Sequence, residues 1–180
     1  MTAPATRPTV IVLASGRGER FTASGGQVHK LQALLGGNKI IDWTLAAVRE
    51  SGLPYHVEDP GHPGMGDSIA AAVRATPDAQ GWLILPADLP LIKPATLLAV
   101  AQALKQSSLV YPMYAGQRGH PVGFGRAYAE QLANLKGNRG AAQLINAGAA
   151  TELIVTDVGC VTDIDTLQDL ELAQKLLASA

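Results

Sequence analysis

Hydrophobic positions along the chain form short continuous runs, separated by longer stretches in which apolar residues recur with helical spacing. The continuous runs at residues 10–13, 82–85 and 110–114 predict buried strands, and the periodic stretches at 40–51 and 94–106 predict helices. Strand and helix alternate through the first two-thirds of the chain. This order predicts parallel βαβ units in a three-layer α/β/α sandwich with a Rossmann-like, mostly parallel sheet.

Shorter segments complete the pattern. Further strands are expected at residues 53–58, 122–124 and 153–155, and further helices from 67 or 68 to 74 and at 128–135, 141–146 and 166–178. A length of 180 residues fits one domain with a proper core. We therefore expect a single domain over residues 1–180.

Composition and charge exclude several classes of protein. The net charge of −1 and the lack of basic runs argue against a nucleic-acid partner. Apolar stretches are too short to span a membrane. Cys160 is the only cysteine, which excludes a disulfide framework and a cysteine metal cluster. The polar N-terminus lacks the apolar core of a secretory signal, so we expect a cytoplasmic protein without a membrane partner.

The most informative segment follows the first predicted strand. After Leu13, residues 14–18 have the sequence ASGRG, a loop of small residues. At the carboxyl edge of a parallel sheet such a loop leaves main-chain N–H groups unpaired for phosphate, and Arg17, Arg20 and Lys30 could add positive charge. The segment lacks both the Gly-Lys-Ser/Thr of a P-loop and the third glycine of a Rossmann fingerprint. A nucleotide loop and a plain tight turn therefore both stay open.

Aspartates after two predicted strands are candidate metal ligands. Asp88 lies in a proline-flanked turn after an apolar strand, where it could hold Mg²⁺ beside a nucleotide phosphate or form an Asx turn. Alternation places Asp163 and Asp165 on one side of an extended segment, so one of them could complete the site. Asp165 or Thr166 could instead cap the last helix.

Three further loops carry candidate binding residues. The glycine-rich stretch 64–68 opens a helix and could contact a base, ribose or phosphate, or be a capped surface loop. The sequence RGHP at 118–121 indicates a positioned loop, and residues 137–140 form a polar loop or a turn between helices. Without a serine elbow, and with Cys160 lacking an obvious base, covalent hydrolase chemistry is not expected.

The joint order of these motifs resembles the MobA-like nucleotidyltransferases, most of all their molybdenum-cofactor cytidylyltransferase branch. The motifs are LASGRGER at 13–20, Lys30 with Leu34 and Gly36, GMGDS at 64–68, PADLP at 86–90, RGHP at 118–121, and DIDT at 163–166 with Asp169 and Leu170. The resemblance extends from Val10 to about Leu172. It implies a fold of the nucleotide-diphospho-sugar transferase type.

The resemblance also implies an activity. It is a Mg²⁺-dependent transfer of a nucleotide, CMP from CTP, to the terminal phosphate of a molybdopterin-type acceptor, with a molybdoenzyme or its chaperone as a further partner. The implied residues are Arg20, Lys30 and Asp88 for catalysis; Leu13, Ala14, Ser15, Gly16, Gly18, Gly64, Met65, Gly66 and Ser68 for the nucleotide; Asp88 and Asp165, with Asp163 in reserve, for Mg²⁺; and Arg118, Gly119 and His120 for the acceptor.

Three departures from the family pattern keep other functions open. Ser15 replaces a usual Ala or Gly, Asp67 replaces a small hydroxyl residue, and Asn138 stands where an aspartate is common. An extra carboxylate repels a nucleotide unless it bonds a base amine or a ribose hydroxyl. Guanylyl transfer to molybdopterin or to another phosphorylated metabolite is therefore an alternative. A non-catalytic nucleotide-binding maturation partner of a molybdoenzyme is an alternative of a different class.

Overall fold

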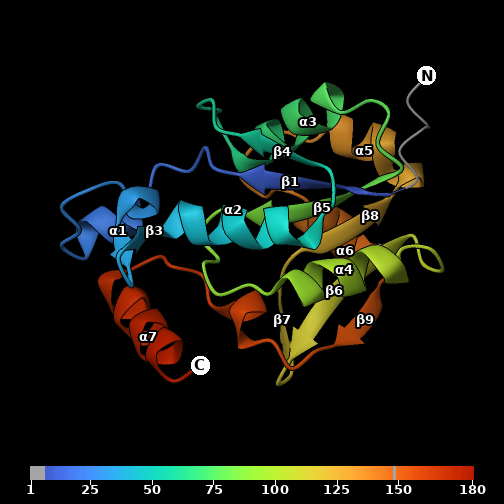
Figure 1. Cartoon of the computed structure of the whole chain (residues 1–180). Helices are drawn as coiled ribbons and strands as arrows, with labels where there is room; N and C mark the ends of the chain where they lie inside the picture. The colour runs from blue at the N-terminus through green and yellow to red at the C-terminus, as the bar shows by residue number, and fades with distance from the viewer. Residues whose placement is uncertain (1–6, 148) are drawn as a thin grey trace.

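The computed structural model describes residues 7–147 and 149–180 (Figure 1). The expectation that the chain lacks a secretory signal concerns its N-terminal segment. Residues 1–6 of that segment lie outside the described residues. Within the described ranges, every helix is too short or too polar to cross a bilayer.

A seven-stranded sheet forms the middle layer, in the order β4-β1-β5-β8-β6-β7, with β9 paired to β6. The strands are β1 (Thr9–Leu13), β4 (Tyr55–Glu58), β5 (Gly81–Pro86), β6 (Leu109–Tyr114), β7 (Gln117–Arg118), β8 (Val122–Gly125) and β9 (Thr151–Ile154). β1 pairs in parallel with β4 and β5, and β6 pairs in parallel with β9. β8 is antiparallel to both β5 and β6, and β7 is antiparallel to β6. The sheet is thus mostly parallel, as predicted, with an antiparallel insertion.

Helices cover both faces of this sheet (Figure 1). They are α1 (Glu19–Ala23), α2 (Ile40–Ser51), α3 (Met65–Ala75), α4 (Pro94–Ala103), α5 (Ala129–Ala133), α6 (Ala142–Ala147) and α7 (Leu167–Ala178). Side chains alternate along β1, so Val10 and Val12 pack into a core with α2 and α4, while Ile11 packs into a second core with α3 and α5. The two cores confirm the three-layer α/β/α sandwich.

Element boundaries depart from the prediction where glycines and short turns intervene. Helix α2 has its predicted limits, because Gly52 ends it in the left-handed conformation. Helix α3 begins at Met65, before residue 67, since the extended Gly64 precedes its first turn. The helix predicted at 128–135 is a 3-10 turn, η2 (Arg126–Tyr128), followed by the shorter α5. Helix α4 ends at Ala103 rather than 106 and β9 begins at 151 rather than 153.

Several short elements have no counterpart in the prediction. These are α1, β7, the two-stranded sheet of β2 (Leu34–Leu35) and β3 (Asn38–Lys39), and the 3-10 helices η1 (Lys30–Gln32) and η3 (Val158–Val161). Each is too short to show a hydrophobic period. Elements α1, η1, β2 and β3 form a small lobe beside α7 (Figure 1), and this lobe carries Lys30 to the carboxyl edge of the sheet.

Candidate functional site

A cleft of about 750 Å³ opens beyond the carboxyl ends of β1 and β5. Most of the residues named from the sequence line it: Leu13, Ser15, Gly16, Gly18, Arg20, Lys30, Gly64, Met65, Ser68, Asp88, Arg118, His120, Asp163 and Asp165. The fold therefore gathers segments from the whole length of the chain around one cavity, at the edge where open α/β sheets bind ligands.

Ala14, Gly66 and Gly119 are not among the residues that line the cleft, because their main-chain groups pack inside the protein. The Ala14 N–H donates to the carbonyl of Glu58 (2.9 Å), and the Gly66 N–H donates to that of Gly137 (2.8 Å). A Cβ on Gly119 would lie 2.6 Å from the carbonyl oxygen of Cys160. The structure thus shows packing contacts for these three residues, and their roles in binding nucleotide or acceptor stay predictions.

The glycine loop presents hydrogen-bond donors. Among the described residues, no hydrogen bond occupies the main-chain N–H groups of residues 15–18. The Gly16 carbonyl lies 2.7 Å from Nε2 of His29, whose Nδ1 accepts from Leu31 N–H, so Nε2 is the donor. Gly18 needs to be glycine because its φ is 67° and a Cβ would lie 3.3 Å from Cγ of Lys30. A loop with free donors and an occupied carbonyl suits an anion.

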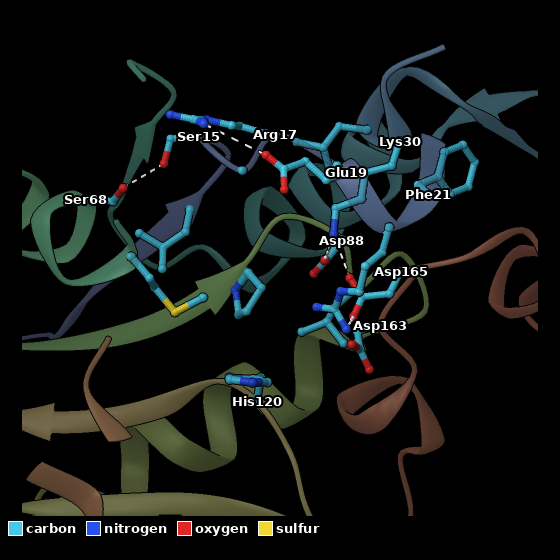
Figure 2. Close-up of a pocket in the computed structure, with 18 of the residues that line it drawn as sticks. Ser15, Arg17, Glu19, Phe21, Lys30, Ser68, Asp88, His120, Asp163 and Asp165 are labelled. Atoms are coloured by element: carbon cyan, nitrogen blue, oxygen red, sulfur yellow. Dashed lines mark hydrogen bonds and ion pairs between the residues drawn. The ribbon is translucent and has the colours of Figure 1, made fainter. Parts of the chain in front are cut away.

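An ionic network forms one end of the cleft (Figure 2). Lys30 Nζ donates to Oδ2 of Asp88 (2.6 Å) and to Oδ1 of Asp165 (3.0 Å), and Arg20 Nη1 lies 2.8 Å from Oδ2 of Asp165. Burial opposes the charge of Lys30, but the attraction and hydrogen bonds of Asp88, then Asp165, outweigh it and raise the pKa of Lys30. The lysine is therefore charged, and it lies between the carboxyl groups of Asp88 and Asp165.

The residues at this end fit a divalent cation. Oδ1 of Asp88 is buried and has no hydrogen-bond partner among the described residues. Partial desolvation and the neighbouring carboxylates of Asp88 and Asp165 raise the pKa of Asp163. Within the described ranges, no group of three or more His, Cys, Asp or Glu residues could hold a metal alone. Mg²⁺ commonly takes only one or two protein carboxylates together with substrate phosphates.

Local hydrogen bonds resolve the alternatives for both aspartates. The Asp88 carboxylate bonds Lys30, and the Asp88 carbonyl accepts from Ile164 N–H (3.0 Å), which ties the two aspartate-bearing loops together. Thr166 caps α7 in a capping box with Asp169. Since Thr166 is the cap, the Asp165 side chain is available to the cleft.

Gln117, Arg118 and His120 form another wall of the cleft, and its buried part, at His120, is uncharged. Arg118 lies over the ring of Tyr111, 5.5 Å from the centroid. His120 Nδ1 is buried without a hydrogen-bond partner in the described part of the chain, and burial lowers the pKa of His120. Burial also raises the pKa of Cys160 to about 11, which leaves a thiol at neutral pH rather than a nucleophile.

The far end of the cleft carries further hydrogen-bonding groups that the sequence indicated only in part. Ser15 Oγ lies 2.7 Å from Ser68 Oγ (Figure 2). His62 lines the cleft, with Nε2 2.7 Å from Oε1 of the buried Glu58, which His56 also contacts at 2.9 Å. Burial opposes the Glu58 charge, but the two histidines outweigh it and lower its pKa.

Sequence reasoning gave no role to His29 and did not place His62 at the site. Each takes its role from contacts with residues elsewhere in the chain, with Gly16 for His29 and with Glu58 for His62. A histidine within a glycine- and proline-rich loop was the one signal for His62.

The fold and the cleft together define an α/β domain of the nucleotidyltransferase type. The chain belongs to the MobA-like NTP transferase domain family, whose sequence model matches residues 46–152. This range contains β4 to β8 and Asp88, and it leaves the glycine loop and Asp165 outside.

Relatives and solved structures agree with this family. The chain is 29% identical over 128 residues to the purine catabolism protein PucB of Bacillus subtilis (strain 168), an alignment covering 68% of the chain and 62% of PucB. The chain therefore spans less than two thirds of that relative.

The crystal structure of Rv0371c from Mycobacterium tuberculosis H37Rv superposes with a TM-score of 0.81 at 24% identity, covering 96% of this chain and 100% of that one. A manganese complex of Rv0371c has a TM-score of 0.76 at 24% identity, covering 95% and 99%. Molybdopterin-guanine dinucleotide biosynthesis protein A of Archaeoglobus fulgidus gives 0.70 at 19% identity, covering 96% and 100%. These likenesses show a shared fold.

Proposed function

We propose that the chain is a divalent-metal-dependent nucleotidyltransferase that moves a nucleoside monophosphate from a triphosphate to a phosphorylated acceptor. The observation that carries this proposal is the network of Arg20, Lys30, Asp88 and Asp165 beside a glycine loop whose N–H donors have no partner in the described part of the chain. Triphosphate binding needs cations and main-chain donors, and in-line phosphoryl chemistry needs little else from a protein.

The reaction is a displacement at phosphorus. A terminal phosphate oxygen of the acceptor attacks the α-phosphorus of the triphosphate and forms a new phosphoanhydride bond. The bond from the α-phosphorus to the oxygen bridging to the β-phosphate breaks, and pyrophosphate leaves with the bonding electrons. An ionised phosphate needs no strong general base, which agrees with a neutral His120 and a protonated Cys160 at the site.

In this proposal the protein orients the phosphates and balances their charge. Main-chain donors of residues 15–18 and the guanidinium of Arg20 hold the triphosphate, and Lys30 moves its charge from the carboxylates toward the phosphates. Asp88 and Asp165, with Asp163 beside them, would hold Mg²⁺ or Mn²⁺, which supplies charge neutralisation at the transferring phosphate. The orphaned Oδ1 of Asp88 supports this assignment.

The substrates we propose are CTP and a molybdopterin-type acceptor. The motif order from residue 13 to Leu170 supports this pair, and the likeness to molybdopterin-guanine dinucleotide biosynthesis protein A supports the acceptor class. That protein is named for a guanine dinucleotide, so guanylyl transfer is the second candidate.

Pyrophosphate release tests the proposal. The chain is incubated with each of CTP, GTP, ATP and UTP, Mg²⁺ or Mn²⁺, and purified molybdopterin, and pyrophosphate is measured with an enzyme-coupled assay. We expect release with one triphosphate, dependent on both metal and acceptor. Nucleotide binding without release under all these conditions would instead favour a non-catalytic maturation partner.

A further inference from the structure

The loop of residues 136–140 docks on the first turn of α3 through two reciprocal hydrogen bonds. The Gly66 N–H donates to the Gly137 carbonyl (2.8 Å), and the Gly137 N–H donates to Oδ2 of Asp67 (3.0 Å). The second bond has a charged acceptor, which makes it stronger than an amide–amide bond. Asp67 is not among the residues lining the cleft, so its carboxylate is used to hold this loop.

Close packing reinforces the docking. A Cβ on Gly64 would overlap the main chain of Gly137 and lie 2.8 Å from Oδ1 of Asn138, and one on Gly66 would lie 2.8 Å from the carbonyl oxygen of Lys136. In the loop itself, a Cβ on Gly140 would lie 2.8 Å from Sδ of Met65. The glycines of the 64–68 motif are therefore required by the neighbouring loop.

Docking brings Asn138 into the cleft. Asn138 lines the cavity with Pro63, Gly64 and Met65, and its carboxamide lies against Gly64. The side chain is solvent-exposed and offers both a donor and an acceptor without charge. It lies against Gly64, the residue before the helix that carries Ser68, and Figure 2 shows Ser68 away from Lys30 and Asp88 at the ionic end.

We infer that Asn138 is a specificity-determining residue for the nucleoside, and that Asp67 positions it through Gly137. The inference rests on the proposed function: if the ionic end takes the triphosphate, the nucleoside extends toward the wall of residues 62–68 and meets Asn138. A carboxamide distinguishes bases by the pattern of donors and acceptors on their edges.

The test measures dissociation constants of CTP, GTP, ATP and UTP with Mg²⁺ by calorimetry, for the unmodified chain and four variants. We expect Asn138→Ala to weaken the preferred nucleotide about tenfold and the others much less, so that discrimination falls. Asp67→Ala should act in the same direction because it releases the loop. Asp67→Asn keeps an oxygen acceptor for the Gly137 N–H and should retain most of the discrimination. Arg139→Ala, an exposed neighbour outside the cleft lining, is the matched control.

The outcomes separate this inference from the proposed function. If the unmodified chain binds one nucleotide selectively and Asn138→Ala keeps the same ratio of dissociation constants, the inference is wrong and the proposed function stands. An equal loss of all four affinities in Asp67→Ala would mean a structural role alone, which also overturns it. If no nucleotide binds the unmodified chain, both the proposed function and this inference are wrong.

Discussion

The two ends of the cleft differ in kind. At one end Lys30, Arg20, Asp88 and Asp165 form a charged network with hydrogen bonds of 2.6–3.0 Å. At the other end, which we call the neutral end, the hydroxyls of Ser15 and of the buried Ser68 and the carboxamide of the exposed Asn138 carry no charge, and the exposed ion pair of Arg17 and Glu19 lies beside Ser15.

This contrast indicates that the two ends of the site have different roles, one in binding phosphate and one in distinguishing nucleosides. Charge interactions are strong and long-ranged, but they are the same for every nucleoside triphosphate. Neutral hydrogen bonds are weaker and strongly directional, so they can distinguish one nucleoside from another. Substitutions at the ionic end should therefore change rate and stability, and substitutions at the neutral end should change selectivity.

The largest effect is expected from Asp88→Asn, which keeps the size of the side chain and removes its charge. The variant should lose at least about a hundredfold in kcat, the scale seen when one group that stabilises the transition state is removed. Steady-state pyrophosphate release measures it. Asp78→Asn, at an exposed site on the α3–β5 turn, is the control and should keep the normal rate. A normal rate in Asp88→Asn would exclude Asp88 as a metal ligand.

Lys30→Met should have the next largest effect, on stability. Lys30, Asp88 and Asp165 have side chains only 12%, 13% and 18% exposed, so removing the ammonium leaves two nearly buried carboxylates without their shared cation. Breaking such a pair costs about 3 kcal/mol, visible as a lower Tm. Mn²⁺ without nucleotide should then raise the Tm of Lys30→Met more than that of the unmodified chain, because a cation replaces the ammonium.

Lys105→Met, which removes an exposed lysine at the end of α4, is the control for this experiment. It should leave both the Tm and the response to Mn²⁺ unchanged. Equal Mn²⁺-induced shifts in Lys30→Met and in the unmodified chain would mean that the carboxylates do not form a cation site.

Ser68→Ala tests the role of the neutral end. Its hydroxyl pairs with Ser15 Oγ at 2.7 Å, so the variant leaves the Ser15 hydroxyl without the partner that orients it toward the nucleotide. Loss of one hydrogen bond to the nucleotide costs about 1 kcal/mol, or roughly fivefold in affinity. We expect a change in nucleotide dissociation constants with little change in the response to metal. Ser107→Ala removes a comparable hydroxyl pair with Thr151, outside the cleft lining, and should change neither. A large loss of metal response in Ser68→Ala would contradict the separation of the two ends.

The smallest effect is expected from pH. Because the folded-state pKa of Glu58 is lowered by His62 and His56, its charge stabilises the fold above the ordinary glutamate pKa. That contribution is lost as the pH falls below the ordinary value and through the folded-state pKa. Glu58→Gln should therefore be less stable than the unmodified chain at neutral pH, with the difference shrinking in acid. Urea unfolding at a series of pH values measures it, and a constant difference would contradict it.

Long hydrophobic runs made the sheet and its layers predictable. The hydrophobic pattern predicted β1, β5 and β6, because each is long enough to show a continuous apolar run. It also predicted α2, which shows a helical period and is ended by Gly52. It gave no sign of the small lobe of α1, η1 and β2–β3, whose elements have five residues or fewer. Their conformation depends on packing rather than on local periodicity, since η1 and β3 contact α2, β2 contacts α7, and Ser24 at the end of α1 accepts a hydrogen bond from the first residue of α7.

Motif order likewise predicted which segments meet at the cleft, but not how each side chain is used. Asp67 looked like a charge beside the nucleotide, and the structure has it bonded to Gly137, seventy positions along the chain. Gly66 is a predicted nucleotide contact, and the structure shows in addition that the main chain of Lys136 leaves no room for a side chain there. Such long-range contacts leave no local pattern in a single sequence.

The hydrogen bond between Lys30 and Asp165 spans 135 positions of the chain. During synthesis the glycine loop, Lys30 and Asp88 all leave the ribosome well before Asp165 does. A nascent chain can therefore pair Lys30 with Asp88 early, while the second carboxylate arrives only with the segment that precedes α7. Translation order thus delays completion of the ionic network until residues 163–166 have been made, so a product that stops before them has at most half of the network.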